Sequence, residues 1–165
     1  MCYLSDNLKD DEMKYALVHE VAHEWWHCLV GNDQINAAYI DEGLAEYSSY
    51  LYFKNAEGNA EVAEKIYNGA IAAYKAFFDI EKTLSENTDA TMNKNLQAFS
   101  SLAEYVAISY DKSLIMFVKY AETVGETKAV KLLKRLARDN AYGNIDLTTI
   151  TKTLGLKEFF VSFVE

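Results

Sequence analysis

The chain has 165 residues, half of them apolar and 13% aromatic, which is the composition of one folded domain with a sizeable core. The net charge of −9 and the absence of a basic patch argue against nucleic acid as a partner. There is no apolar run long enough to cross a membrane, and the N-terminus lacks the layout of a signal peptide. The sequence therefore predicts no membrane contact for this chain and leaves its compartment open.

The first predicted helix covers residues 10–30. Acidic residues at its start suit the positive end of a helix, and Gly31 with Asn32 is a stop signal. Two cysteines, Cys2 and Cys28, are too few for a disulfide-stapled scaffold, so we expect free thiols. We expect Cys28 to pack as a small hydrophobe in this helix. One buried face is expected from apolar residues at helical spacing: Val18, Ala22, Trp25 and Leu29.

The rest of the chain has no proline, and its periodic stretches predict a series of further helices. They cover residues 41–55, 60–84, 109–123, 128–140, 147–154 and 157–164. Aromatic residues within 47–53 are interpreted as core, and the polar segment 85–97 as a loop. Alternating strand patterns are missing, with the first few residues as the only exception. The predicted fold class is mostly α.

His19 and His23 are four residues apart on the first helix, so they point the same way and can share one metal ion. Glu20 is turned about 100° around the helix from His19, which suits a base acting on water better than a ligand. The pattern His-Glu-x-x-His is the zincin signature, in which the ion is zinc and the glutamate is the general base.

A catalytic zinc takes three protein ligands, so a third must be found. His27 would lie about 12 Å along a continuous helix from His19, too far to share the ion, and is interpreted as a surface or second-layer residue. Glu42, separated from His23 by eighteen residues, can return on an antiparallel second helix and is the preferred third ligand. Asp41 is the alternative, with a shorter side chain one position round the helix.

Glu46 lies one turn beyond Glu42 on the second helix. Two interpretations stay open for it. The carboxylate can sit one layer behind the ion and fix a zinc-bound histidine by accepting its second N–H, or it can be a solvated helix carboxylate.

The stretch from His19 to Glu42, with the pair Trp25-Trp26 and the segment "DEGLAEY", resembles the gluzincin aminopeptidases, the family of alanyl aminopeptidase and leukotriene hydrolase. The segment "LVGND" is similar to the bacterial branch. The resemblance implies the helical half of a thermolysin-like zincin catalytic domain. It also implies that His19, His23 and Glu42 bind zinc, with Glu20 as the general base and proton shuttle.

The resemblance extends to the segment "YDKS", which places Tyr110 where the family carries its catalytic tyrosine. Ser113 stands where the family usually has glycine. A phenol O–H there can donate to the negative oxygen that forms when water attacks an amide. Tyr105 also matches a tyrosine of some members, without an assigned role.

The family's GxMEN motif, which lines the substrate cleft from an upstream strand, has no counterpart in the eighteen residues before His19. We therefore expect residues 1–165 to form a single domain, the C-terminal helical part of the catalytic domain of a larger protein, whose other domains are its expected partners. The expected function is zinc-dependent hydrolysis of peptide bonds. The alternatives are a non-catalytic zinc-binding helical domain and a zinc hydrolase acting on an ester or epoxide. Peptide specificity and oligomeric state are not predicted.

Overall fold

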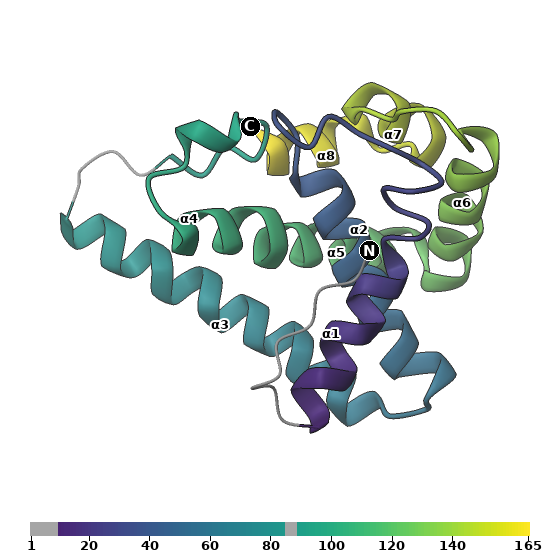
Figure 1. Cartoon of the computed structure of the whole chain (residues 1–165), viewed down its shortest axis with the longest axis horizontal. Coiled ribbons are helices and arrows are strands. Elements are labelled where there is room, and N and C mark those ends of the chain that lie inside the picture. Colours follow the sequence, from purple (N-terminus) through teal and green to yellow (C-terminus); the bar gives the residue numbers. More distant parts are fainter. Residues whose placement is uncertain (1–9, 85–88) are drawn as a thin grey trace.

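The computed structural model describes residues 10–84 and 89–165, and this part of the chain is built from helices (Figure 1). Within these ranges the only β-type pairings are two isolated bridges, Trp26 with Val30 and Gly31 with Asn144. The prediction of a mostly α fold is confirmed, whereas the first few residues, the exception allowed for a strand, lie outside the described part. The elements are, in chain order, α1 (Asp10–Ala22), α2 (Tyr39–Leu51), the π-helix η1 (Tyr52–Ala56), α3 (Ala60–Leu84), the 3-10 helix η2 (Leu96–Ala98), α4 (Leu102–Val106), the π-helix η3 (Ala107–Lys112), α5 (Ser113–Val124), α6 (Glu126–Asp139), α7 (Leu147–Leu154) and α8 (Lys157–Val164).

Within the two described ranges, we find no helix whose length and apolar character would let it cross a bilayer.

Helices with a clear periodic stripe begin and end where the sequence predicts. This holds for α3, α7 and α8. The start of α7 is fixed by Asp146, whose side chain accepts a hydrogen bond from the backbone N–H of Thr149 at 2.7 Å. Two predicted helices turn out to contain a π-helical segment instead of continuing regularly. These segments are η1, which follows α2, and η3, which joins α4 to α5.

The first helix is shorter than predicted, because α1 ends at Ala22. Beyond it the backbone forms a wide turn whose hydrogen bonds join residues five apart, such as Val30 N–H to the carbonyl of Trp25 at 2.9 Å. Trp26 precedes these bonds and donates its backbone N–H to the carbonyl of Ala22 at 3.0 Å, so it lies one helical turn beyond that buried residue. Trp26 is therefore buried at 7% exposure, while Trp25 is 52% exposed, against the prediction. Cys28 lies in the wide turn as an exposed free thiol, so its predicted place in the core was wrong.

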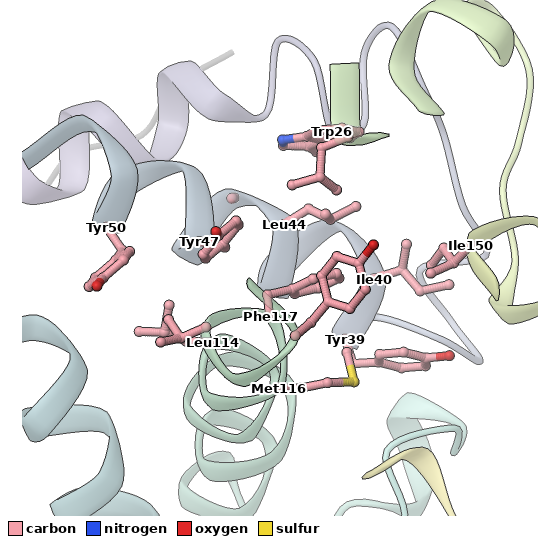
Figure 2. Close-up of a cluster of buried hydrophobic side chains, with 14 of the residues drawn as sticks. Trp26, Tyr39, Ile40, Leu44, Tyr47, Tyr50, Leu114, Met116, Phe117 and Ile150 are labelled. Carbon is pink, nitrogen blue, oxygen red and sulfur yellow. The ribbon is translucent and has the colours of Figure 1, made fainter. Parts of the chain in front are cut away.

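α2 lies at the centre of the molecule, with α1 and α5 packed against it and α3, η3 and α6 to α8 arranged around them (Figure 1). Its buried face meets the apolar residues of α5 (Figure 2). The wide turn after α1 is tied to α2 by Trp26, whose indole N–H donates to Ser48 Oγ at 2.9 Å. The central cluster drawn in Figure 2 includes Trp26, Tyr39, Ile40, Leu44, Tyr47, Tyr50, Leu114, Met116, Phe117 and Ile150. The aromatic residues of segment 47–53 are thus core, as predicted, apart from the exposed Tyr52.

Gly43 sits at the contact between α2 and α5. A Cβ added there would lie 2.4 Å from Ser113 Cβ and 3.3 Å from Phe117 Cε2, both closer than ordinary contact. Glycine at this position therefore lets the two helices approach closely. Gly43 directly follows Glu42 in the sequence. The close approach sets the distance between Glu42 on α2 and the tyrosines that precede α5.

Candidate metal centre

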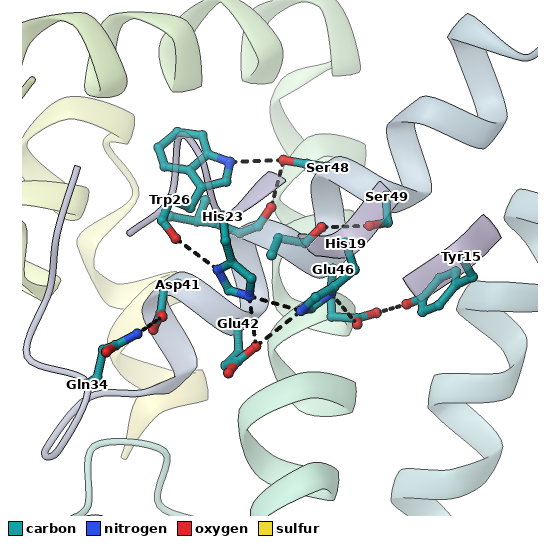
Figure 3. A network of polar contacts seen from close by, with 12 residues as sticks. Tyr15, His19, His23, Trp26, Gln34, Asp41, Glu42, Glu46, Ser48 and Ser49 are labelled. Atoms are coloured by element: carbon teal, nitrogen blue, oxygen red, sulfur yellow. Dashed lines mark hydrogen bonds and ion pairs between the residues drawn. The ribbon is translucent and has the colours of Figure 1, made fainter. Parts of the chain in front are cut away.

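Three donor atoms from α1, the turn after it and α2 converge at one point (Figure 3). His19 Nε2 lies 3.0 Å from His23 Nε2 and 3.3 Å from Glu42 Oε2, and His23 Nε2 lies 3.4 Å from the same oxygen. Donors at about 2.0–2.1 Å from an ion in tetrahedral arrangement would lie about 3.3–3.4 Å apart. Two imidazoles and a carboxylate at this spacing fit a zinc ion. Among the described residues, no other cluster offers three such donors.

The far nitrogen of each histidine is engaged, which leaves both Nε2 atoms facing the centre. His23 Nδ1 lies 3.0 Å from the carbonyl oxygen of Trp26. That carbonyl is available because the Val30 N–H bonds to Trp25 in the wide turn. His19 Nδ1 lies 2.9 Å from Glu46 Oε1, a contact with the distance of an ion pair but without linear hydrogen-bond geometry. Such contacts fix the tautomer and orientation of metal-binding imidazoles.

The electrostatics of the cluster favour a positive charge at its centre. Burial acts to raise the pKa of Glu42, but its contacts with His19, His23 and Tyr110 lower it to about 2. Burial acts to lower the pKa of His19, but contacts with Glu42 and Glu46 raise it to about 9. The negative charge of Glu42 beside the two imidazoles therefore favours a cation at this centre.

Asp41, the alternative ligand, faces away from the histidines. It is buried at 1% exposure and accepts hydrogen bonds from Asn32 Nδ2 at 2.9 Å and Gln34 Nε2 at 2.5 Å. Its carboxylate therefore ties the loop between α1 and α2 to the start of α2. Glu46 is buried, so the solvated alternative for its carboxylate does not hold.

Tyr110 and Tyr105 lie on the η3 side of the cluster. Tyr110 belongs to η3, and its ring stacks on His19 with the centroids 5.7 Å apart and the planes at 15°. Tyr105 donates from its hydroxyl to Glu42 Oε1 at 3.3 Å and meets Tyr110 edge-on at 5.7 Å. Burial and the charge of Glu42 raise the pKa of Tyr110, so its phenol stays protonated and able to donate. π-Helical turns often occur at functional sites, and η3 is one that brings a tyrosine to the histidines.

Glu20 and His27 do not belong to the group of convergent donors. Glu20 is half-buried on α1 between the two histidines in sequence. His27 is exposed and belongs to the wide turn rather than to a helix, with a φ of 154° that few non-glycine residues adopt. It is not among the three convergent donors.

Sequence reasoning missed Tyr15, one turn before His19 on α1. Its hydroxyl donates to Glu46 Oε2, the oxygen that does not face His19 (Figure 3). Burial and the negative charge of Glu46 raise the pKa of this phenol. The chain has twelve tyrosines, and Tyr15 lies in no distinctive motif. Only its position four residues before His19 could have drawn attention to it.

Comparisons with known proteins give one positive result. The model of the peptidase family M1 domain matches residues 4–161, nearly the whole chain. No curated protein and no solved structure matched. The family match covers the histidine pair, Glu42, Tyr105 and Tyr110 alike, and it supports peptidase activity in general. The chain belongs to peptidase family M1.

Proposed function

We propose that this chain binds one zinc ion through His19, His23 and Glu42 and carries the hydrolytic chemistry of a metallopeptidase. The observation that carries the proposal is the triangle of donor atoms, 3.0–3.4 Å on each side, in a member of a peptidase family. Peptides are the proposed substrates. Residues 1–165 are proposed to act as a single domain, the helical part of a catalytic domain that other parts of a larger protein complete.

The chemistry assigns a separate task to each residue beside the ion. Bound zinc would polarise the scissile carbonyl and make water more acidic. Glu20 accepts a proton from the attacking water and passes it to the leaving amine. Tyr110 donates its phenol proton in a hydrogen bond to the carbonyl oxygen as negative charge grows there. The raised pKa of that phenol supports this role, because it remains a donor throughout the neutral range.

A substrate panel tests the proposal. The zinc-loaded chain is incubated with peptides that have a free amino terminus, their N-acetylated counterparts, and an ester of matched side chain. Cleavage of the free peptides alone would indicate an aminopeptidase, and cleavage of both peptide sets an endopeptidase. Cleavage of the ester alone would point to a different hydrolase, and binding of zinc without any cleavage would contradict a catalytic role for this chain by itself.

Two variants identify the source of any turnover. Glu20→Gln keeps the shape of the side chain and removes the base, so we expect kcat to fall by about 10²–10⁴-fold with zinc still bound. Tyr110→Phe removes one donor to the oxyanion and should lower kcat by about 10²–10³-fold. Turnover that survives both changes would come from a contaminant or from another site.

A further inference from the structure

Two rows of side chains face each other between α1 and α2 (Figure 3). The row on the α1 side consists of Tyr15, His19 and His23, which recur every four residues and share one face. The row on α2 consists of Glu42 and Glu46, which are one turn apart. Tyr15 meets Glu46, and His23 meets Glu42. Between these two pairs, His19 contacts both glutamates.

Glu46 uses its two oxygens on different partners. Oε1 lies 2.9 Å from His19 Nδ1, and Oε2 accepts the hydroxyl proton of Tyr15. The side chain of Glu46 is only 10% exposed, so a buried carboxylate depends on these partners for its stability. Rotation of the carboxylate toward one partner would break its contact with the other.

Tyr15 is itself held in place. Its ring stacks on that of Phe53 in η1, with the centroids 6.3 Å apart and the planes at 14°. Phe53 is buried at 4% exposure, so the phenol rests on the core of the domain. The hydroxyl therefore meets the carboxylate from a fixed direction.

We propose that Tyr15 is a positioning residue of the metal centre, which orients His19 through the Glu46 carboxylate. The inference rests on the proposed zinc site and adds to it a residue that touches neither the ion nor the substrate. The phenol fixes the plane of the carboxylate, and the carboxylate fixes the ring and the tautomer of His19. Loss of an outer partner of a metal-binding histidine typically weakens metal binding by about 10–100-fold. Because Tyr15 acts on His19 only through Glu46, we expect Tyr15→Phe to weaken zinc binding about tenfold.

The test is a double-mutant cycle on the zinc dissociation constant of the full 165-residue chain, measured by competition with a chelator. Tyr15→Phe and Glu46→Ala are made singly and together. Tyr47→Phe is the matched control. Tyr47 follows Glu46 on α2 and is buried at 1% exposure, and its hydroxyl has no hydrogen-bond partner in the described part of the chain. The visible spectrum of the Co²⁺-loaded proteins and the thermal unfolding of the metal-free proteins are recorded for each.

Three results support the proposal together. Tyr15→Phe weakens zinc binding about tenfold and alters the Co²⁺ spectrum, whereas Tyr47→Phe changes neither. In the Glu46→Ala background, Tyr15→Phe has no further effect. Equal affinity and equal spectra of Tyr15→Phe and wild type would overturn the inference while leaving the zinc site intact. The same loss in both backgrounds would overturn it too, since Tyr15 would then act through the fold. If Glu46→Ala does not fold, the Co²⁺ spectrum of Tyr15→Phe decides. A wild-type chain that binds no zinc would refute the proposed function itself.

Discussion

Gly43→Ala tests whether the contact between α2 and α5 sets the geometry of the site. The added methyl would lie 2.4 Å from Ser113 Cβ, and ordinary contact begins at 3.4 Å, so the helices must separate by about 1 Å to accommodate it. Ser113 is fully buried at the start of α5, which leaves the backbone as the part that has to move.

The magnitude follows from two opposing effects. Overpacking of a tight interior costs about 1–3 kcal/mol, whereas replacing glycine with alanine inside a helix gains about 1 kcal/mol. We therefore expect the free energy of unfolding of the metal-free protein to fall by up to about 2 kcal/mol. Gly69 in α3 is the matched control, because a Cβ there meets nothing within 4 Å. Gly69→Ala should raise the free energy of unfolding by about 0.5–1 kcal/mol.

Urea unfolding of the metal-free variants measures both changes. The double variant Gly43→Ala/Ser113→Gly removes the Cβ that the new methyl would meet, so it should be about 1–2 kcal/mol more stable than the sum of the single effects. Separation of α2 from α5 also shifts Glu42 relative to the histidines, so zinc binding by Gly43→Ala should weaken while that of Gly69→Ala is unchanged. If Gly43→Ala were as stable as Gly69→Ala, the reasoning about this contact would be refuted.

Two further predictions concern strain and pH. His27→Gly should raise the free energy of unfolding by about 1 kcal/mol in urea, because glycine adopts the φ of 154° without strain; a loss of stability would count against it. Burial and the charge of Glu46 raise the pKa of the Asp111 carboxyl to about 7. The native state then binds more protons than the unfolded chain between about pH 4 and 7, so stability falls as the pH rises through that range. Asp111 is only partly buried, so solvent screens part of this effect. We therefore expect Asp111→Asn to recover no more than about 2 kcal/mol of the free energy of unfolding at pH 8. Unfolding midpoints of the metal-free proteins from pH 4 to 8 measure the difference, and parallel curves for wild type and variant would contradict the assignment.

The long periodic stretches were predictable because burial and helical spacing agree in them. A regular apolar stripe marks α3, which spans Ala60–Leu84, and α7 and α8 are bounded by recognisable end signals. The end of α1 was not predictable in this way. Apolar spacing continues through Trp25 and Leu29 as if the helix went on, whereas the backbone changes to bonds between residues five apart. Trp26, one turn beyond the buried Ala22, is itself buried, whereas Trp25 is exposed.

The candidate site followed from spacing alone as far as the convergence of His19, His23 and Glu42. Its outer parts depend on contacts between elements, which a single sequence does not reveal. The stacking of Tyr110 on His19 needs the π-helical turn of η3, and the contact of Tyr15 with Glu46 needs the antiparallel pairing of α1 with α2. Asp41 shows the converse, since a plausible ligand by sequence is used to hold the loop before α2.

The most direct test of the central claim is the zinc content of the purified chain, measured by elemental analysis after dialysis, beside Glu20→Gln and Glu42→Ala. A site with three protein ligands should hold about one zinc per chain in wild type and in Glu20→Gln, and removal of the carboxylate ligand in Glu42→Ala should abolish retention. Wild-type protein without zinc after refolding in its presence, or Glu42→Ala retaining as much zinc as wild type, would contradict the proposed metal centre.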